Sequence, residues 1–189
     1  MRKYQGDVRG FTTQAPRIAS VLQNEIFVTE AYVSPTGTLP APPSKSYIGI
    51  WDTGATNSVI SKKIVNDLGL KPSGMVTVHA VGDGDAVHTY QTPTYMVNFY
   101  LPNMVAVSGV RASLGTVTGG DILLGMDIIS TGDFAISSYQ GQTTWTFRFP
   151  SCEQTDYVKE INEHNKQFPS AEERRKARNK AKAEKRKTR

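Results

Sequence analysis

The residues best suited to chemistry are Asp52, Thr53 and Gly54, which directly follow the short apolar run Tyr47 to Trp51. A run of this length is typical of a strand buried on both faces. An unpaired charge in an apolar setting is costly, so a carboxylate delivered there must be hydrogen-bonded or neutralised. Thr53 supplies a neighbouring hydroxyl, and Gly54 allows a tight turn that a Cβ would obstruct. The stretch therefore predicts a single positioned carboxyl group, which is suited to acid–base chemistry.

A simpler interpretation is that Asp-Thr-Gly is an ordinary turn. Asp and Gly are common turn residues, and at average composition the tripeptide arises by chance in roughly a few per cent of chains this long. The residues for other chemistries are absent, because no Ser or Cys lies in a recognised nucleophile motif and the histidines have no metal-ligand spacing (His79, His88 and His164). We expect no metal and no cofactor, and any hydrolysis must use carboxylates.

Two motifs resemble the active-site region of the retropepsin-like aspartic proteases, whose single-lobed subunits pair into dimers. The segment Asp52-Thr-Gly-Ala, two further residues and then Ser58-Val-Ile fit the extended active-site loop of that family. The stretch Ile122 to Ile129, which contains Gly125, is similar to the strand, glycine and short helix that pack against the loop. The resemblance covers roughly residues 18–150. It implies a mostly β fold, a closed β-barrel acid-protease lobe with a short helix after the second motif.

The function implied by the resemblance is that of an aspartic endopeptidase, a hydrolase of peptide bonds that works as a homodimer. Each subunit supplies one Asp-Thr-Gly, so Asp52 and its mate would face each other across a twofold axis. Two carboxyl groups about 3 Å apart cannot both ionise and therefore share one proton. One can then deprotonate water while the other protonates the substrate carbonyl. By the same resemblance the Thr53 hydroxyls interlock across the axis, and Gly54 lies near the substrate backbone.

A flexible flap is expected after the catalytic loop. Strand-like residues 75–81 and 86–90 flank Gly82-Asp-Gly-Asp, which predicts a hairpin turn. In the resembled family such a hairpin closes over the protein or peptide substrate and excludes water. An ordinary hairpin is the alternative, and a calcium loop is excluded by the short run without a downstream Glu. The expected substrate contacts are Ala55, Thr56, Val81, Gly82, Asp83 and Gly84.

Three segments are expected along the chain: a flexible leader over residues 1–16, which are polar and lack a period, the protease domain over 17–150, and a helical Lys/Arg-rich tail over 151–189. Within the domain the pattern predicts an exposed Pro-rich loop over 34–45, a short helix from Ser61 to a glycine cap at Gly69, and a series of strands. The predicted strands lie within 18–33, 95–101, 104–110, 133–137 and 143–149, of which the last two form a hairpin across Tyr139-Gln-Gly that is our candidate dimer interface.

Met126 marks a departure from the viral members of the resembled family. Those members often have Asp at the positions of Thr56 and Asn57 and a basic residue at that of Met126, so their interface ion pair cannot form here. Asp127 is a candidate to compensate, either by capping the short helix or by hydrogen-bonding near the catalytic loop.

The positive charge is concentrated at the end of the chain. Residues 1–150 hold 10 Lys/Arg and 10 Asp/Glu, whereas residues 151–189 hold 12 and 7. A helix is expected over 154–168, and Ser170 with Glu173 forms a capping box that opens a second one. The tail is either a solvated, partly frayed helix or a basic arm that binds nucleic acid or another polyanion. It has no interleaved aromatic residues for base stacking.

The apolar runs and the lone cysteine bear on the location of the protein. No apolar run reaches the ~18 residues of a membrane span, no apolar stretch follows Arg2 and Lys3 as in a secretory signal, and the lone Cys152 suits a reducing interior. We expect a cytoplasmic protein without membrane contacts.

Two alternative functions remain open beside the endopeptidase. One alternative is a non-catalytic dimeric retropepsin-like module for binding or assembly, with the basic tail contacting nucleic acid or another polyanion. The other is a processing protease encoded by a phage or mobile element.

Overall fold

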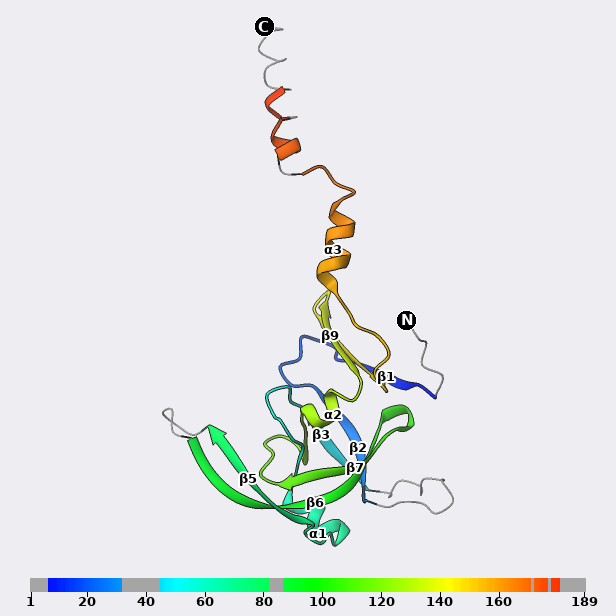
Figure 1. Ribbon diagram of the computed structural model, residues 1–189. Coiled ribbons are helices and arrows are strands. Elements are labelled where there is room, and N and C mark those ends of the chain that lie inside the picture. The colour runs from blue at the N-terminus through cyan, green and yellow to red at the C-terminus, as the bar shows by residue number, and fades with distance from the viewer. Residues whose placement is uncertain (1–6, 32–44, 82–86, 171, 177, 181–189) are drawn as a thin grey trace. The chain divides into compact units, whose positions relative to one another are not determined.

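The structure is a computed structural model that describes residues 7–31, 45–81, 87–170, 172–176 and 178–180. The chain divides into two compact units, Met1–Cys152 and Glu153–Arg189. Among its described residues the first unit has ten strands and a few short helices (Figure 1). The Pro-rich loop expected over 34–45 lies outside the described residues except at its last position.

Six strands of the first unit close into a barrel in the order β2-β3-β8-β4-β7-β6, because β6 pairs back with β2. Burial along β2 alternates residue by residue, so one of its faces fills the barrel. The expected mostly β, closed-barrel architecture is confirmed. The barrel strands are β2 (Gln23–Glu30), β3 (Ser46–Trp51), β4 (Val59–Ile60), β6 (Val87–Leu101), β7 (Val105–Leu114) and β8 (Ile122–Leu124).

The two sequence motifs meet inside this barrel. Strand β8 lies between β3 and β4, parallel to β3 with Gly49 opposite Ile122 and antiparallel to β4 with Val59 opposite Leu123. The side chains of Ile122 and Leu124 are fully buried. Since β3 and β4 are the strands on either side of residues 52–58, β8 holds both ends of the candidate catalytic loop.

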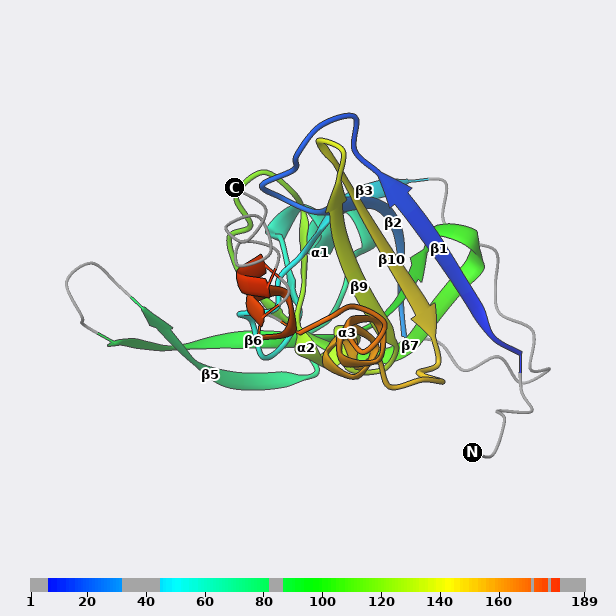
Figure 2. The same ribbon diagram turned by 90° about the horizontal axis from the view of Figure 1, so that it is seen from above.

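A separate three-stranded sheet is formed by β1 (Arg9–Gln14), β10 (Gln142–Phe149) and β9 (Asp133–Tyr139), which lie side by side in Figure 2. The expected β9–β10 hairpin is confirmed, and it turns through Gln140 and Gly141, which both have positive φ.

The prediction of a flexible leader is wrong for residues 9–14, because β1 pairs with β10 along its whole length. Phe11 is the one buried side chain of β1, so the strand is held mainly by its backbone and gives little hydrophobic signal.

The end of this sheet is fixed by one carboxylate. The Asp133 carboxylate accepts hydrogen bonds from Arg148 Nε at 2.7 Å, Ser151 Oγ at 2.6 Å and the Cys152 amide at 2.9 Å. Partial burial alone would raise the pKa of Asp133, but these donors outweigh it and hold that pKa below its ordinary value. The residues that follow β10 are therefore tied to the start of β9.

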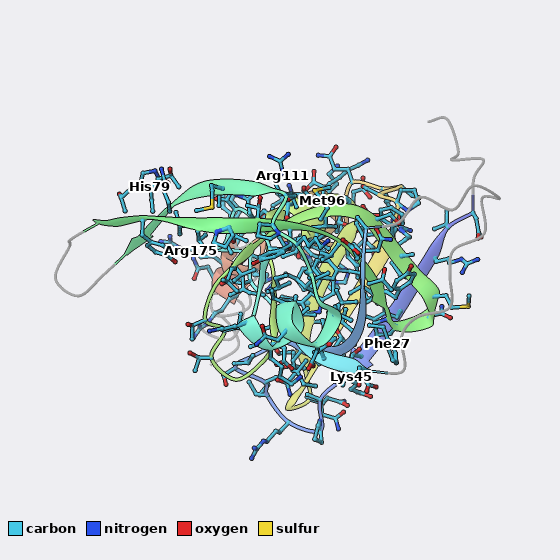
Figure 3. The ribbon with its side chains drawn as sticks, turned by 90° about the horizontal axis from the view of Figure 1, so that it is seen from below. Phe27, Lys45, His79, Met96, Arg111 and Arg175 are labelled. Carbon is cyan, nitrogen blue, oxygen red and sulfur yellow. The ribbon has the colours of Figure 1, made fainter. Side chains whose placement is uncertain are left out.

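The hairpin expected as a flap begins as a long two-stranded arm of β5 (Gly74–Val81) and β6. The strand expected over 95–101 is continuous with the return strand, through Pro93, which a strand interior normally excludes. Pairing of β6 with β7 starts only at Thr94, so the missing N–H of Pro93 need not face a strand on that side. In Figure 3 His79 lies on this arm, away from the side chains that fill the barrel. The predicted flap tip, residues 82–86, lies outside the described residues.

The helix predicted after the catalytic loop is α1 (Lys62–Leu68), which ends at Gly69 in the left-handed region, as expected. Its Asp67 connects it to the start of β3, through an ion pair with Lys45 at 3.0 Å and a hydrogen bond from the Tyr47 hydroxyl at 3.3 Å. Burial and the adjacent Asp67 carboxylate raise the pKa of Tyr47 to about 12.

The second unit holds α3 (Tyr157–Asn165), whose Asp156 side chain caps it by accepting from the Lys159 N–H at 3.1 Å. Ser170 and Glu173 make the reciprocal hydrogen bonds of a capping box, and residues 172–176 are helical and exposed. Within the described ranges, the helices are all too short or too polar to cross a bilayer.

Candidate active site

Asp52 is the first residue after β3, and its backbone N–H donates to the Leu124 carbonyl of β8 at 2.9 Å. The Gly54 N–H donates to Oδ1 of the Asp52 carboxylate at 2.8 Å, and the Ala55 N–H donates to the Asp52 carbonyl at 3.3 Å. Asp52 is half-buried, whereas Thr53 and Gly54 are exposed. The turn thus orients the carboxylate and leaves it accessible from the surface of the unit. The three predicted catalytic residues are brought together in this turn.

The short helix α2 (Met126–Ile129) braces the loop from behind. The first N–H groups of a helix have no intrahelical partner, and here the Met126 N–H donates to the Ala55 carbonyl at 2.8 Å and the Asp127 N–H to the Thr56 carbonyl at 3.2 Å. A Cβ on Gly125 would lie within 3 Å of backbone atoms of Ala55 and Asn57. The loop can therefore approach α2 this closely only because residue 125 is glycine.

Asp127 makes a second set of bonds to the loop. Its carboxylate accepts the Ser58 N–H at 3.0 Å and the Ser58 hydroxyl at 2.8 Å, and the Ser58 oxygen accepts the Gly125 N–H at 3.1 Å. Ser58 is fully buried. The expectation that Asp127 hydrogen-bonds near the catalytic loop is confirmed. Both ends of the loop are therefore fixed, one by the Asp52 turn and the other by Ser58.

Replacing Asp127 with Ala should destabilise the first unit by about 2–4 kcal/mol, because two buried donors of Ser58 lose their acceptor. Asp127→Asn keeps one acceptor oxygen in place and should cost about 1 kcal/mol. Urea unfolding of the two variants measures the difference. Equal losses for Ala and Asn would contradict the assigned bonding.

A pocket of about 380 Å³ opens beside Asp52. Trp51, which precedes Asp52, stacks on Phe134 of β9 with ring centroids 4.8 Å apart. The sequence did not indicate that the segment before β2 and the β9–β10 hairpin line this pocket. The alternating apolar residues of β9 were the one available signal for the hairpin. The pocket is lined by Ala19, Ser20, Val21, Leu22, Ile50, Trp51, Asp52, Thr53, Phe134, Ile136, Ser138 and Thr143.

The predicted substrate contacts are placed only in part. Ala55 and Thr56 lie in the loop, with their carbonyls bound to α2. Val81 ends β5, and Gly82, Asp83 and Gly84 lie outside the described residues. No group of three or more metal-ligating side chains occurs among the residues that the structure describes.

No family model matches the sequence, and no curated protein matches it. Among solved structures, a retropepsin-like aspartic protease from Rickettsia conorii is similar at 12% identity and a TM-score of 0.44, covering 77% of this chain and 98% of that chain.

Proposed function

We propose that this chain is an aspartic-type endopeptidase that hydrolyses peptide bonds as a homodimer. The observation that carries the proposal is the Asp52 turn, which holds one accessible carboxylate by a 2.8 Å hydrogen bond from the Gly54 N–H. Two further hydrogen bonds from α2 to the loop carbonyls resist its displacement. Rigid support of this kind is what a positioned general acid or base requires.

The homodimer follows from the chemistry, because attack by water on an amide needs both a base and an acid. The chain contains one Asp-Thr-Gly, so the second carboxyl group comes from Asp52 of a second copy across a twofold axis. The open edge of β9 next to the pocket suits this contact, since Ile136 and Tyr139 there are 50% and 75% exposed. An unpaired, exposed strand edge is a natural surface for pairing with another chain.

In the proposed mechanism one Asp52 carboxylate takes a proton from a water held between the two subunits. The resulting hydroxide adds to the substrate carbonyl carbon, and the other, protonated Asp52 gives its proton to the carbonyl oxygen. Collapse of the tetrahedral intermediate breaks the C–N bond as the Asp52 that took the water proton protonates the leaving nitrogen. The other Asp52, now a carboxylate, takes a proton from a hydroxyl of the intermediate, so that the carboxylic acid product forms and the pair again holds one proton. Thr53 and Gly54 are assigned to holding the loops together and to contacting the substrate backbone.

Activity should depend on protein concentration, because each active site needs two chains. We expect the specific activity on a diverse peptide pool between pH 3 and 7.5 to fall on dilution in step with the dimer fraction from sedimentation. A wild-type protein that is folded and dimeric but cleaves no peptide in this range, where an added active aspartic protease does, would contradict the proposal. Cleavage by an isolated monomer would contradict the shared site.

The second candidate function is a non-catalytic module whose tail binds nucleic acid or another polyanion. The described part of the second unit exposes Arg174, Arg175, Lys176, Arg178 and Lys180, and of these Lys176 pairs with Glu172 at 2.8 Å. Removal of residues 153–189 separates the candidates. If this deletion abolishes the function of the protein while Asp52→Asn leaves that function unchanged, the binding module is favoured. If Asp52→Asn abolishes it while the deletion leaves it unchanged, the endopeptidase is favoured.

A further inference from the structure

Both tryptophans of the chain donate to a single atom. The indole N–H groups of Trp51 and Trp145 lie 2.8 and 3.0 Å from Oδ1 of Asn24. All three side chains are buried, and Asn24 is 8% exposed. An amide oxygen has two lone pairs, so its accepting capacity is fully used. The amide nitrogen of Asn24 donates to the Thr13 hydroxyl at 2.8 Å. One side chain of β2 therefore joins β3, β10 and β1.

Strand register brings these partners together. In the β2–β3 pair Asn24 lies opposite Gly49, which puts its side chain on the same face as Trp51, two residues further on. Diagonal neighbours of this kind are within reach of long side chains. In the β1–β10 pair Thr13 lies opposite Trp145. Asn24 thus occupies the place where the barrel meets the three-stranded sheet.

The hydrogen bonds of Asn24 hold Trp51, the residue that precedes Asp52. The Trp51 ring is held at its N–H by Asn24 and at its faces by the hairpin, with Phe134 stacked at 4.8 Å and Phe147 tilted at 5.1 Å. The backbone N–H of Trp51 also donates to the Leu22 carbonyl at 3.0 Å. A change in the direction of Trp51 would rotate the turn that follows it.

We propose that Asn24 is a positioning residue for Asp52, which it orients by fixing the Trp51 indole against the β9–β10 hairpin. The inference rests on the proposed endopeptidase function. It also connects the hairpin, our candidate dimer surface, to the catalytic turn through a defined pair of hydrogen bonds. Asn24 itself is assigned no contact with the substrate.

The chain offers a matched control in Asn98 of β6, which is 1% exposed and whose Oδ1 accepts the Gly109 N–H at 2.9 Å. Asn24→Leu and Asn98→Leu each replace a buried amide with an apolar side chain of the same branching and heavy-atom count. The first leaves two indole N–H groups without their acceptor and the second leaves the Gly109 N–H without its acceptor. Asn24→Asp keeps an oxygen where both indoles donate. The three variants separate loss of stability from loss of positioning.

The experiment measures peptide cleavage and backbone hydrogen exchange of residues 52–58 in full-length protein, well below each variant's unfolding temperature. For Asn24→Leu we expect kcat to fall at least tenfold with KM within about twofold, faster exchange of the loop, and altered tryptophan emission. Asn24→Asp should recover most of kcat and of the slow exchange. Asn98→Leu should lose stability while kcat and loop exchange stay near wild type.

The opposite pattern would overturn the proposal. If Asn24→Leu and Asn98→Leu change loop exchange and kcat alike, Asn24 serves stability only. If the wild-type protein cleaves nothing, the proposed function fails, and the exchange of residues 52–58 still decides whether Asn24 positions the loop.

Discussion

Asp52→Asn should reduce peptide cleavage at least about 10³-fold while leaving the fold intact. Each dimer would lose both ionisable groups of its acid–base pair, and such groups contribute roughly 10²–10⁴-fold to a rate. Stability should change little, because the Asn side-chain oxygen can still accept the Gly54 N–H that now binds Oδ1 at 2.8 Å. The measurement is kcat/KM on a peptide selected from the pool, with the unfolding temperature and dimer fraction recorded for the same samples.

The matched control for this substitution is Asp67→Asn, which also neutralises one carboxylate. Asp67 lies on α1, and its side-chain partners in the described part of the chain are Lys45 at 3.0 Å, Tyr47 at 3.3 Å and Lys63 at 3.8 Å, none of which belongs to the catalytic turn. It should keep cleavage within about twofold of wild type. Equal cleavage by wild type and Asp52→Asn would remove the catalytic role of Asp52 and point to a contaminant or another site.

Gly125→Ala should destabilise the first unit by about 3 kcal/mol or more, because the new Cβ would meet rigid backbone. It would lie 2.7 Å from the Asn57 carbonyl carbon and 2.9 Å from the Ala55 oxygen, and neither atom can move without shifting the catalytic loop. For a unit of about this size the unfolding temperature should fall by roughly 6–12 °C. Cleavage should also drop in protein that remains folded, since the loop would separate from α2.

Gly74→Ala is the control for Gly125→Ala. It makes the same chemical change at the start of β5, where the new Cβ would come no closer than 3.4 Å to the Thr94 hydroxyl. Its unfolding temperature should equal or slightly exceed that of wild type, because glycine weakens a strand. A similar loss in both variants would show that the close approach at Gly125 is not the cause.

The local signals of the sequence predicted much of the fold and the centre of the site. The strand before Asp52, the glycine cap of α1 and the Gln140-Gly141 turn each depend on neighbours in sequence, so they could be recognised without the fold. The expectation that this strand is buried on both faces was wrong, because burial alternates along β3 and Ile48 is 38% exposed. The prediction that residues 122–129 pack against the loop came from the family resemblance. For Asp127 the sequence left two roles open, a helix cap or hydrogen bonds near the catalytic loop.

What escaped prediction depends on register between distant strands. Strand β1 has one buried side chain and is defined by its pairing with β10. Asn24 looked like a polar residue in a strand, and nothing near it in sequence indicated that two indoles would meet its oxygen. The length of β6 was hidden by Pro93, whose tolerance depends on where β7 begins to pair.

The pairing of β1 with β10 sets the order in which the chain can fold. Thr12 and its partner Thr146 are 134 residues apart in sequence, so β1 leaves the ribosome long before the strand that it needs. Contacts between such distant segments slow folding, because the loop-closure entropy must be paid before they form. Until β10 is made, β1 is an unpaired strand that another chain could capture. Assembly of this sheet should therefore be a late step of biosynthesis and the one most sensitive to crowding by other nascent chains.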